Sequence, residues 1–207
     1  MAYTAKTFAL NPMNGISARQ VEVHIKLYEG YVKHVNLIRD TLEKLKTADT
    51  PAYVRDELRR RYAFEWNGAR LHEYYFEQFE GAPAPIDPES TLGATLARSF
   101  GSTDAFKAHV LEVAATRGIG WIIATFDPRE EHVQVSWVSD HEIGQLAGAH
   151  IIFALDMWEH AFMVDYVPAD KMRYVEAVFA NLNGTILSQR FSAANGNAPS
   201  VAPTSIM

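Results

Sequence analysis

The chain has 207 residues, 48% of them hydrophobic and 21% charged, which is the composition of an ordinary globular protein. Its formal net charge of −6 at pH 7 argues against a nucleic-acid-binding protein. There is no cysteine, so disulfides and thiolate metal sites are excluded, and any metal would be held by imidazole and carboxylate groups. Residues 1–17 lack the apolar core of a signal peptide, and no stretch approaches the ~20 apolar residues of a membrane span. We therefore expect a cytoplasmic protein with neither membrane nor nucleic-acid partners.

The first half of the chain predicts two long helices. The first begins after Ser17, a favourable N-cap residue, and shows clear helical periodicity. The second begins at Pro51 and ends at Gly81. The Pro-rich segment 82–90 that follows is the best candidate for a linker. We expect a helical N-terminal domain over residues 1–88, built on a long α-hairpin.

The second half predicts short helices around a small sheet. Two helices are expected over residues 91–118, and the second of them is capped by Ser102 or Thr103. Residues 120–127 and 132–139 are rich in β-branched and aromatic side chains and are separated by a short polar turn. This pattern predicts an antiparallel pair of strands.

A third strand is predicted over residues 148–156. It is followed directly by a helix over 157–166 and, after a loop, by one further helix over 171–191. These elements predict an α+β domain, residues 89–192, with a three-stranded antiparallel sheet. The small, polar, Pro- and Gly-containing residues 193–207 predict a flexible tail. The chain as a whole is assigned to the α+β class.

Two of the eight histidines lie on apolar helix faces. His24 and His72 each have aliphatic or aromatic residues three, four and seven positions further along the chain. A lone histidine of this kind is usually a hydrogen-bonded core residue. Asp156 and His160, however, stand four positions apart in an apolar segment, and an unpartnered buried polar group costs about 2–7 kcal/mol. One shared metal ion satisfies all four groups more economically than four separate hydrogen-bonding arrangements.

Three imidazoles and one carboxylate suit iron, manganese or zinc. The sequence has no H-E-x-x-H zinc motif, no P-loop and no G-x-G-x-x-G motif. The residues alone therefore predict a non-haem metal site in an α+β protein, and they leave its reaction open.

The segment DMWEHAF, residues 156–162, resembles the D-x-W-E-H-A-aromatic signature of the iron/manganese superoxide dismutases. Weaker matches follow in the order expected for this family: ISARQVEVH around the first ligand, YVKHVN, WNGARLHEYYF around the second ligand, SFGSTDAFK and GIGW. The resemblance covers roughly residues 15–190. It agrees with the family's helical N-terminal domain and α+β C-terminal domain.

The resemblance implies a superoxide dismutase, which is an oxidoreductase. His24, His72, Asp156 and His160 would bind one iron or manganese ion per subunit, with a water or hydroxide as the fifth ligand. The ion would cycle between its 2+ and 3+ states and convert superoxide to oxygen and hydrogen peroxide. The bound solvent and its hydrogen-bond partners would deliver the protons.

The resemblance also assigns residues around the metal. Trp121 and Trp158 would form the apolar wall of its pocket. Glu159 would reach across a dimer interface to His160 of the partner subunit, which implies a homodimer or a dimer of dimers.

Some residues depart from the family pattern. The gateway tyrosine normally follows the first ligand by eight residues, whereas Tyr31 follows His24 by seven; we assign the role to Tyr31, with Tyr28 as the alternative. The glutamine that hydrogen-bonds the metal-bound solvent is missing from both of its usual places, which hold Gly68 and His141. We expect His141 to replace it, with a surface-loop histidine as the alternative. This combination favours iron or a site that works with either metal.

Another departure concerns the dimer contact. Tyr28 and Glu29 replace a pair of histidines, and Met163 replaces the tyrosine that meets one of them across the interface. Both partners of that hydrogen bond have changed together. We therefore predict that Tyr28 packs against Met163 of the partner subunit.

Two other functions are alternatives to a dismutase. A non-enzymatic binding or structural protein would share the fold, although such proteins are expected to lack a ligand and none is missing here. A zinc hydrolase would use the same three histidines and Asp156, although no general base is evident near them.

Overall fold

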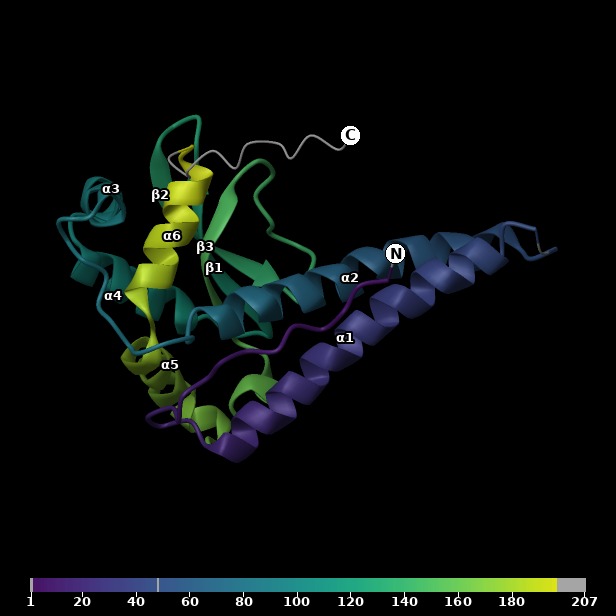
Figure 1. The fold of residues 1–207 in the computed structure, drawn as a ribbon, viewed down its shortest axis with the longest axis horizontal. Helices are drawn as coiled ribbons and strands as arrows, with labels where there is room; N and C mark the ends of the chain where they lie inside the picture. Colours follow the sequence, from purple (N-terminus) through teal and green to yellow (C-terminus); the bar gives the residue numbers. More distant parts are fainter. Residues whose placement is uncertain (1, 48, 197–207) are drawn as a thin grey trace, which may run out of the picture.

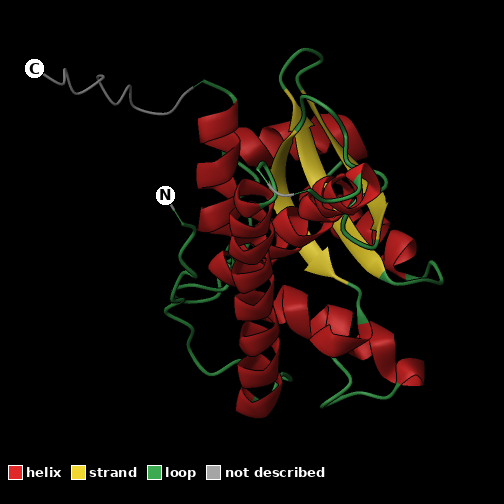
Figure 2. Cartoon of the chain, turned by 90° about the vertical axis from the view of Figure 1, so that its right-hand side faces the viewer, coloured by secondary structure: helices red, strands yellow, loops and turns green. Residues whose placement is uncertain are grey.

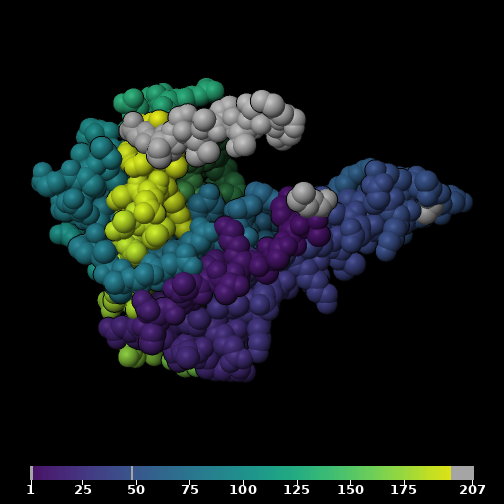
Figure 3. All heavy atoms as spheres, viewed as in Figure 1, coloured from purple at the N-terminus to yellow at the C-terminus, as the bar shows by residue number. Residues whose placement is uncertain are grey.

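The computed structural model describes residues 2–47 and 49–196, and its first half is a hairpin of two long helices (Figure 1). The helices are α1 (Ala18–Lys44) and α2 (Ala52–Glu77), which run side by side. The predicted N-cap is confirmed, because the Ser17 hydroxyl accepts a hydrogen bond from the backbone N–H of Gln20 at 3.0 Å. In the space-filling view the hairpin projects well beyond the rest of the molecule (Figure 3).

The second half contains shorter helices and a sheet. The helices are α3 (Thr91–Phe100), α4 (Thr103–Ala114), α5 (Lys171–Asn181) and α6 (Gly184–Ala194), and the strands are β1 (Gly120–Asp127), β2 (His132–Ser139) and β3 (His150–Asp156). The strand order is β2–β1–β3, and both neighbouring pairs are antiparallel. Figure 2 shows the three strands together as one small sheet beside the long helices. The predicted α+β class and three-stranded antiparallel sheet are confirmed.

The core lies where the hairpin meets the sheet. The central strand β1 is buried along nearly its whole length, and its side chains include Trp121, Ile122, Ile123 and Phe126. Each such aliphatic or aromatic side chain stabilises the fold by about 1.5–3 kcal/mol when it leaves water. Helix α2 packs against β3, while α3 packs against β2. The hairpin therefore packs against the edge of the sheet that β3 forms.

The prediction of a helix over residues 157–166 is wrong. β3 ends at Asp156, and a single 3₁₀ turn over Glu159–Ala161 is followed by further turns. The reason is local: the Asp156 side chain accepts a hydrogen bond from the backbone N–H of Trp158 at 2.9 Å. Such a side-chain bond to the following backbone competes with helix formation.

The prediction of a single helix over residues 171–191 is also wrong, because this segment forms two helices. Asn183 separates α5 from α6, and its side chain caps α6 by accepting a hydrogen bond from Thr185 N at 3.1 Å. The tail predicted from residue 193 begins too early, since α6 continues to Ala194. Residues 197–207 of that predicted tail lie outside the described residues.

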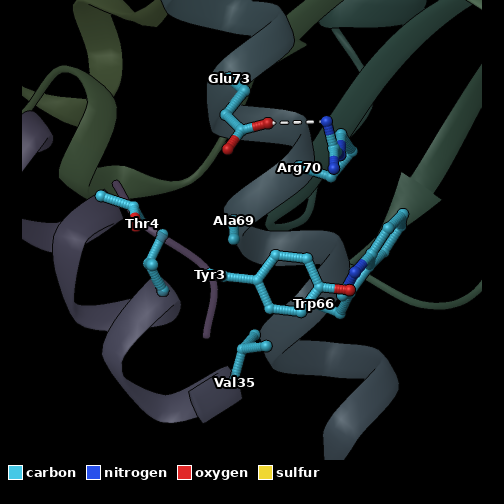
Figure 4. A pocket seen from close by; sticks show the side chains of 8 residues that line it. Tyr3, Thr4, Val35, Trp66, Ala69, Arg70 and Glu73 are labelled. Carbon is cyan, nitrogen blue, oxygen red and sulfur yellow. Dashed lines mark ion pairs between the residues drawn. The ribbon is translucent and has the colours of Figure 1, made fainter. Parts of the chain in front are cut away.

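The N-terminal segment, residues 2–16, lies along the hairpin (Figures 1 and 3). Asn36 of α1 holds the backbone of Tyr3 by two hydrogen bonds of 2.8 Å. Where Tyr3 meets the hairpin there is a shallow pocket (Figure 4), lined by Tyr3, Thr4, Val32, Val35, Trp66, Ala69, Arg70 and Glu73. None of the predicted site residues lines it. Within the described parts of the chain, every helix is too short or too polar to cross a membrane.

Candidate metal centre

The four predicted ligand residues come together in the structure. Their ligand atoms all lie within 4.8 Å of one another, and His24, His72 and Asp156 are buried. Oδ2 of Asp156 lies 2.9 Å from His24 Nε2, 3.1 Å from His160 Nε2 and 3.5 Å from His72 Nε2. Among the described residues, this is the one group of three or more His, Asp or Glu side chains arranged to hold a metal.

Each half of the chain supplies two of these side chains. α1 carries His24 and α2 carries His72, both on the faces that the helical periodicity predicts to be buried. Asp156 is the last residue of β3, and His160 lies in the 3₁₀ turn that follows. Their convergence is therefore produced by a strand end, as predicted for Asp156, and by a tight turn in place of the helix on which we expected His160.

One nitrogen of His72 makes no hydrogen bond to the part of the chain that the structure describes. Its Nδ1–H donates to the carbonyl oxygen of Gly68 at 2.6 Å, which fixes the tautomer and leaves a lone pair on Nε2. Nε2 is buried and makes no hydrogen bond within the described residues. A buried polar atom is rarely left unsatisfied. An unpaired imidazole nitrogen facing a carboxylate and two further imidazoles is what a metal site requires.

The protonation states also suit a metal. Burial lowers the pKa of His24 and of His72, so both rings are neutral at neutral pH. Burial opposes ionisation of Asp156, but the neighbouring His160 and His24 outweigh it and hold the pKa of the carboxyl below its ordinary value. Metal ligation needs neutral imidazole and ionised carboxylate. This donor set fits iron or manganese.

Tyr31 and His141 form a hydrogen-bonded chain beside the ligands. The Tyr31 ring lies 5.2 Å from that of His72, and its hydroxyl is 2.7 Å from His141 Nε2. Trp121 Nε1, which can only donate, bonds to His141 Nδ1 at 2.8 Å. Because burial lowers the pKa of His141 to about 4, the ring is neutral and its Nε2–H donates to Tyr31. His141 is fully buried, so the alternative of a surface histidine is wrong.

Tyr28, the alternative gateway residue, has its hydroxyl engaged elsewhere. The hydroxyl accepts a hydrogen bond from Lys6 N at 2.8 Å and donates to Glu73 Oε1 at 3.1 Å. Tyr28 is fully buried within its own chain, whereas 49% of Met163 is exposed. The predicted contact between Tyr28 and Met163 of the partner subunit is therefore wrong, because Tyr28 has no surface to offer. Tyr31 is the tyrosine joined to the site.

Both predicted wall tryptophans lie against ligand histidines. The Trp121 ring meets His72 edge-on at 5.0 Å. Trp158 stacks on His160 at 5.6 Å and on His141 at 4.9 Å. The two indoles therefore place apolar ring surface against two of the four ligand side chains, namely His72 and His160. Glu159, by contrast, is exposed and lies outside the cluster.

Gly68 is required by the position of Tyr31. A Cβ atom at Gly68 would lie 2.6 Å from Cδ1 of Tyr31, well inside contact distance. Replacing glycine by alanine within a helix normally stabilises a protein by about 1 kcal/mol. We expect Gly68→Ala to do the opposite and to lower the free energy of unfolding by about 1–3 kcal/mol, because the Tyr31 ring must move.

Chemical denaturation measures this effect, and Gly30→Ala is the matched control. Gly30 lies on α1, and a Cβ there has no atom within 4 Å. Gly30→Ala is expected to be neutral or stabilising. Equal stability changes for the two variants would show that Gly68 is not constrained by Tyr31.

Two buried glutamines contact the ligand-bearing backbone and were not identified from the sequence. Gln20 hydrogen-bonds to the segment around His160, and Gln78 hydrogen-bonds to β3. The sequence offered one signal for Gln20, which lies four residues before His24 and so on the same buried face of α1. It offered none for Gln78.

Comparison with known proteins identifies the family. The model of "Iron/manganese superoxide dismutases, C-terminal domain" matches residues 88–190. The superoxide dismutase (Fe) of Cupriavidus metallidurans is 33% identical over 199 residues, which cover 94% of this chain and 98% of that protein. The superoxide dismutase (Fe) of Aquifex aeolicus is 31% identical over 89% of each chain. The superoxide dismutase (Mn) 1 of Halobacterium salinarum is 29% identical over 83% of this chain and 84% of its own. The chain belongs to the iron/manganese superoxide dismutase family.

Proposed function

We propose that this protein is an active superoxide dismutase, with one iron or manganese ion held by His24, His72, Asp156 and His160. The observation that carries the proposal is the buried Nε2 of His72, which makes no hydrogen bond within the described residues and lies inside a complete set of four donors. When bound, such an ion supplies one-electron redox chemistry, so that one superoxide is oxidised to oxygen and a second is reduced and takes up two protons to give hydrogen peroxide. Family membership favours neither the non-enzymatic alternative nor the zinc hydrolase.

The chain's own contribution is to hold and orient protons. Trp121 donates to His141, and His141 donates to the Tyr31 oxygen. The hydroxyl hydrogen of Tyr31 is therefore free to be donated toward the metal site. Burial raises the pKa of Tyr31 above its ordinary value, which keeps the phenol protonated. Tyr31 is thus the proposed proton donor. Both ring nitrogens of His141 are engaged by Trp121 and Tyr31, so we propose that His141 positions Tyr31 instead of bonding to the metal-bound solvent as expected from the sequence. Trp121 and Trp158 keep bulk water from this network.

We favour iron as the metal. The combination of Gly68 and His141 supports it, because the resemblance associates this combination with iron or with either metal. The relatives of Cupriavidus metallidurans and Aquifex aeolicus, both named for iron, also support it. The manganese-named relative of Halobacterium salinarum keeps manganese as the second candidate.

A homodimer is the proposed assembly. Glu159 is exposed beside His160, as a residue that reaches a partner subunit would be. Three apolar side chains in the same region are about half exposed, namely Met163, Val164 and Val167. Apolar surface next to a metal ligand supports a contact with a second copy of the chain. A dimer of dimers, the domains over 1–88 and 89–192, and a cytoplasmic location stay predictions.

Elemental analysis combined with an assay of superoxide consumption tests the proposed function. The purified protein is expected to carry close to one iron or manganese per chain and to consume superoxide. Removing the metal with a chelator should abolish the activity, and reloading should restore it, because the redox chemistry depends on the ion. A protein that carries zinc, or one that binds iron or manganese without consuming superoxide, would contradict the proposal.

A further inference from the structure

Gln20 hydrogen-bonds to the segment that carries the fourth ligand, His160. It lies one turn before His24 on α1, and its side chain is almost completely buried. Nε2 donates to the carbonyl oxygen of His160 at 2.7 Å, and Oε1 accepts from Val164 N at 3.0 Å. One carboxamide therefore connects α1, which carries His24, to the backbone of His160, which lies 136 positions later in the chain (160 − 24).

Gln78 does the same at the other end of that segment. It follows α2 directly, six residues after His72, and is fully buried. Nε2 donates to Ala154 O at 2.8 Å, and Oε1 accepts from Ala154 N at 3.3 Å. β3 is an edge strand, so no strand of the described residues pairs with the outward backbone groups of Ala154. Gln78 replaces that strand two residues before Asp156.

The two glutamines form a consistent pattern. The α1 helix and the end of α2 each supply one ligand histidine and one carboxamide, and both carboxamides hold the stretch that supplies the other two ligands. Residues 157–165 of this stretch consist mostly of turns and have no regular ladder of hydrogen bonds to fix them. Their position relative to the helices depends on side-chain contacts, and these amides are buried where water cannot compete for them.

We propose that Gln20 and Gln78 are positioning residues that set the spacing between the two helix-borne histidines and the Asp156–His160 segment, and that they thereby set the affinity of the site for its metal. The inference rests on the metal site of the proposed function. Ligand distances in metal sites are defined to about ±0.2 Å. A small shift of the segment would therefore weaken the site without removing any ligand.

The chain offers a matched control for this proposal. Asn181 of α5 is also buried, and it holds the backbone of Asn14 by the same two bonds, accepting from Asn14 N at 2.8 Å and donating to Asn14 O at 2.7 Å. Asn14 belongs to the N-terminal segment and supplies no ligand. Asn181→Leu removes the same kind of carboxamide contact without changing the ligand-bearing backbone.

The experiment compares Gln20→Met, Gln78→Met and Asn181→Leu in the full-length chain. Methionine keeps the size of glutamine and removes both hydrogen bonds. Each protein is loaded with the same metal, and we measure its visible or EPR spectrum, the rate at which a chelator removes the metal, and the melting temperature of the metal-free form. Both glutamine variants are expected to release metal about 10-fold faster or more, with an altered spectrum. Asn181→Leu is expected to lower the melting temperature and to leave release rate and spectrum unchanged.

Wild-type release rates and spectra in both glutamine variants would overturn the proposal, as would equally fast release from Asn181→Leu. If a methionine variant does not fold, Gln20→Asn or Gln78→Asn keeps a carboxamide that is one methylene shorter, and the same faster release is expected. His160→Ala separates this result from failure of the metal site itself. Unchanged metal content in that variant would refute the four-ligand site, whatever the glutamine variants do.

Discussion

Asp156→Asn is expected to abolish tight metal binding and, with it, superoxide consumption. The Asp156 carboxylate supplies the one anionic donor of the cluster, and its Oδ2 lies within 3.5 Å of all three imidazole Nε2 atoms. An asparagine there is neutral and presents either a weaker oxygen or an amide N–H to the metal. The metal affinity should fall by more than ~100-fold, which is the loss expected when the changed residue only hydrogen-bonds to a ligand.

The metal-free form of Asp156→Asn should stay folded. The substitution preserves side-chain volume, but it removes a carboxylate whose pKa, despite burial, the neighbouring His160 and His24 hold below its ordinary value, so the metal-free variant is expected to unfold at a lower temperature than the metal-free wild type. Added metal should raise the melting temperature of the wild type alone, because a ligand that binds the native state stabilises it. Elemental analysis and thermal unfolding measure both effects. Full metal content or full activity in the variant would refute the assigned ligand set.

His141→Ala is expected to reduce turnover by about 10–100-fold while the metal content stays that of the wild type. His141 is not one of the four ligands. It lies between Trp121 and Tyr31, accepts a hydrogen bond from the first and donates one to the second. Its removal leaves the buried Trp121 N–H without an acceptor and releases the Tyr31 hydroxyl from its fixed orientation. Steady-state kinetics with parallel metal analysis separates turnover from metal loss.

The conservative control is His141→Gln. A glutamine can accept from Trp121 and donate to Tyr31, so this variant is expected to recover most of the turnover lost in His141→Ala. Loss of metal in step with loss of turnover would show that His141 supports the site rather than the proton network. Unchanged turnover in His141→Ala would remove it from the mechanism altogether.

The parts of the fold that the sequence predicts correctly depend on local signals. Ser17 is a good N-cap and does cap α1. His24 and His72 could be placed in the core because their helical neighbours are apolar, and both are buried. The β1–β2 pair follows from two β-rich runs separated by a short turn. Each of these signals lies within one turn or one strand of the residue concerned.

The errors arose where a local pattern was outweighed by a specific contact. Residues 157–166 have an apolar pattern compatible with a helix, but Asp156 bonds to Trp158 N and turns the chain. Asn183 followed by glycine was a breaker signal inside residues 171–191, and it separates α5 from α6. Tyr28 was assigned to an interface by comparison with the family, yet its partners Lys6 and Glu73 lie in its own chain.

The roles of Gln20 and Gln78 could not be predicted, because the groups they bind are remote in sequence. Gln20 bonds to a residue 140 positions away, and Gln78 to one 76 positions away. A polar residue on a buried helix face predicts that a hydrogen-bond partner exists, but it does not indicate which group that partner is. Only the packed structure identifies that partner.

The wide spacing of the ligands has a consequence for how the protein matures. His24 and Asp156 are 132 positions apart, and His72 comes from a third segment between them. Closing loops of this length carries an entropic cost that packing of the hairpin against the sheet must first offset. An ion that needs all four donors is therefore captured late, after both halves have folded and docked. Variants that fold slowly are therefore expected to acquire their metal more slowly, even when their finished site is intact.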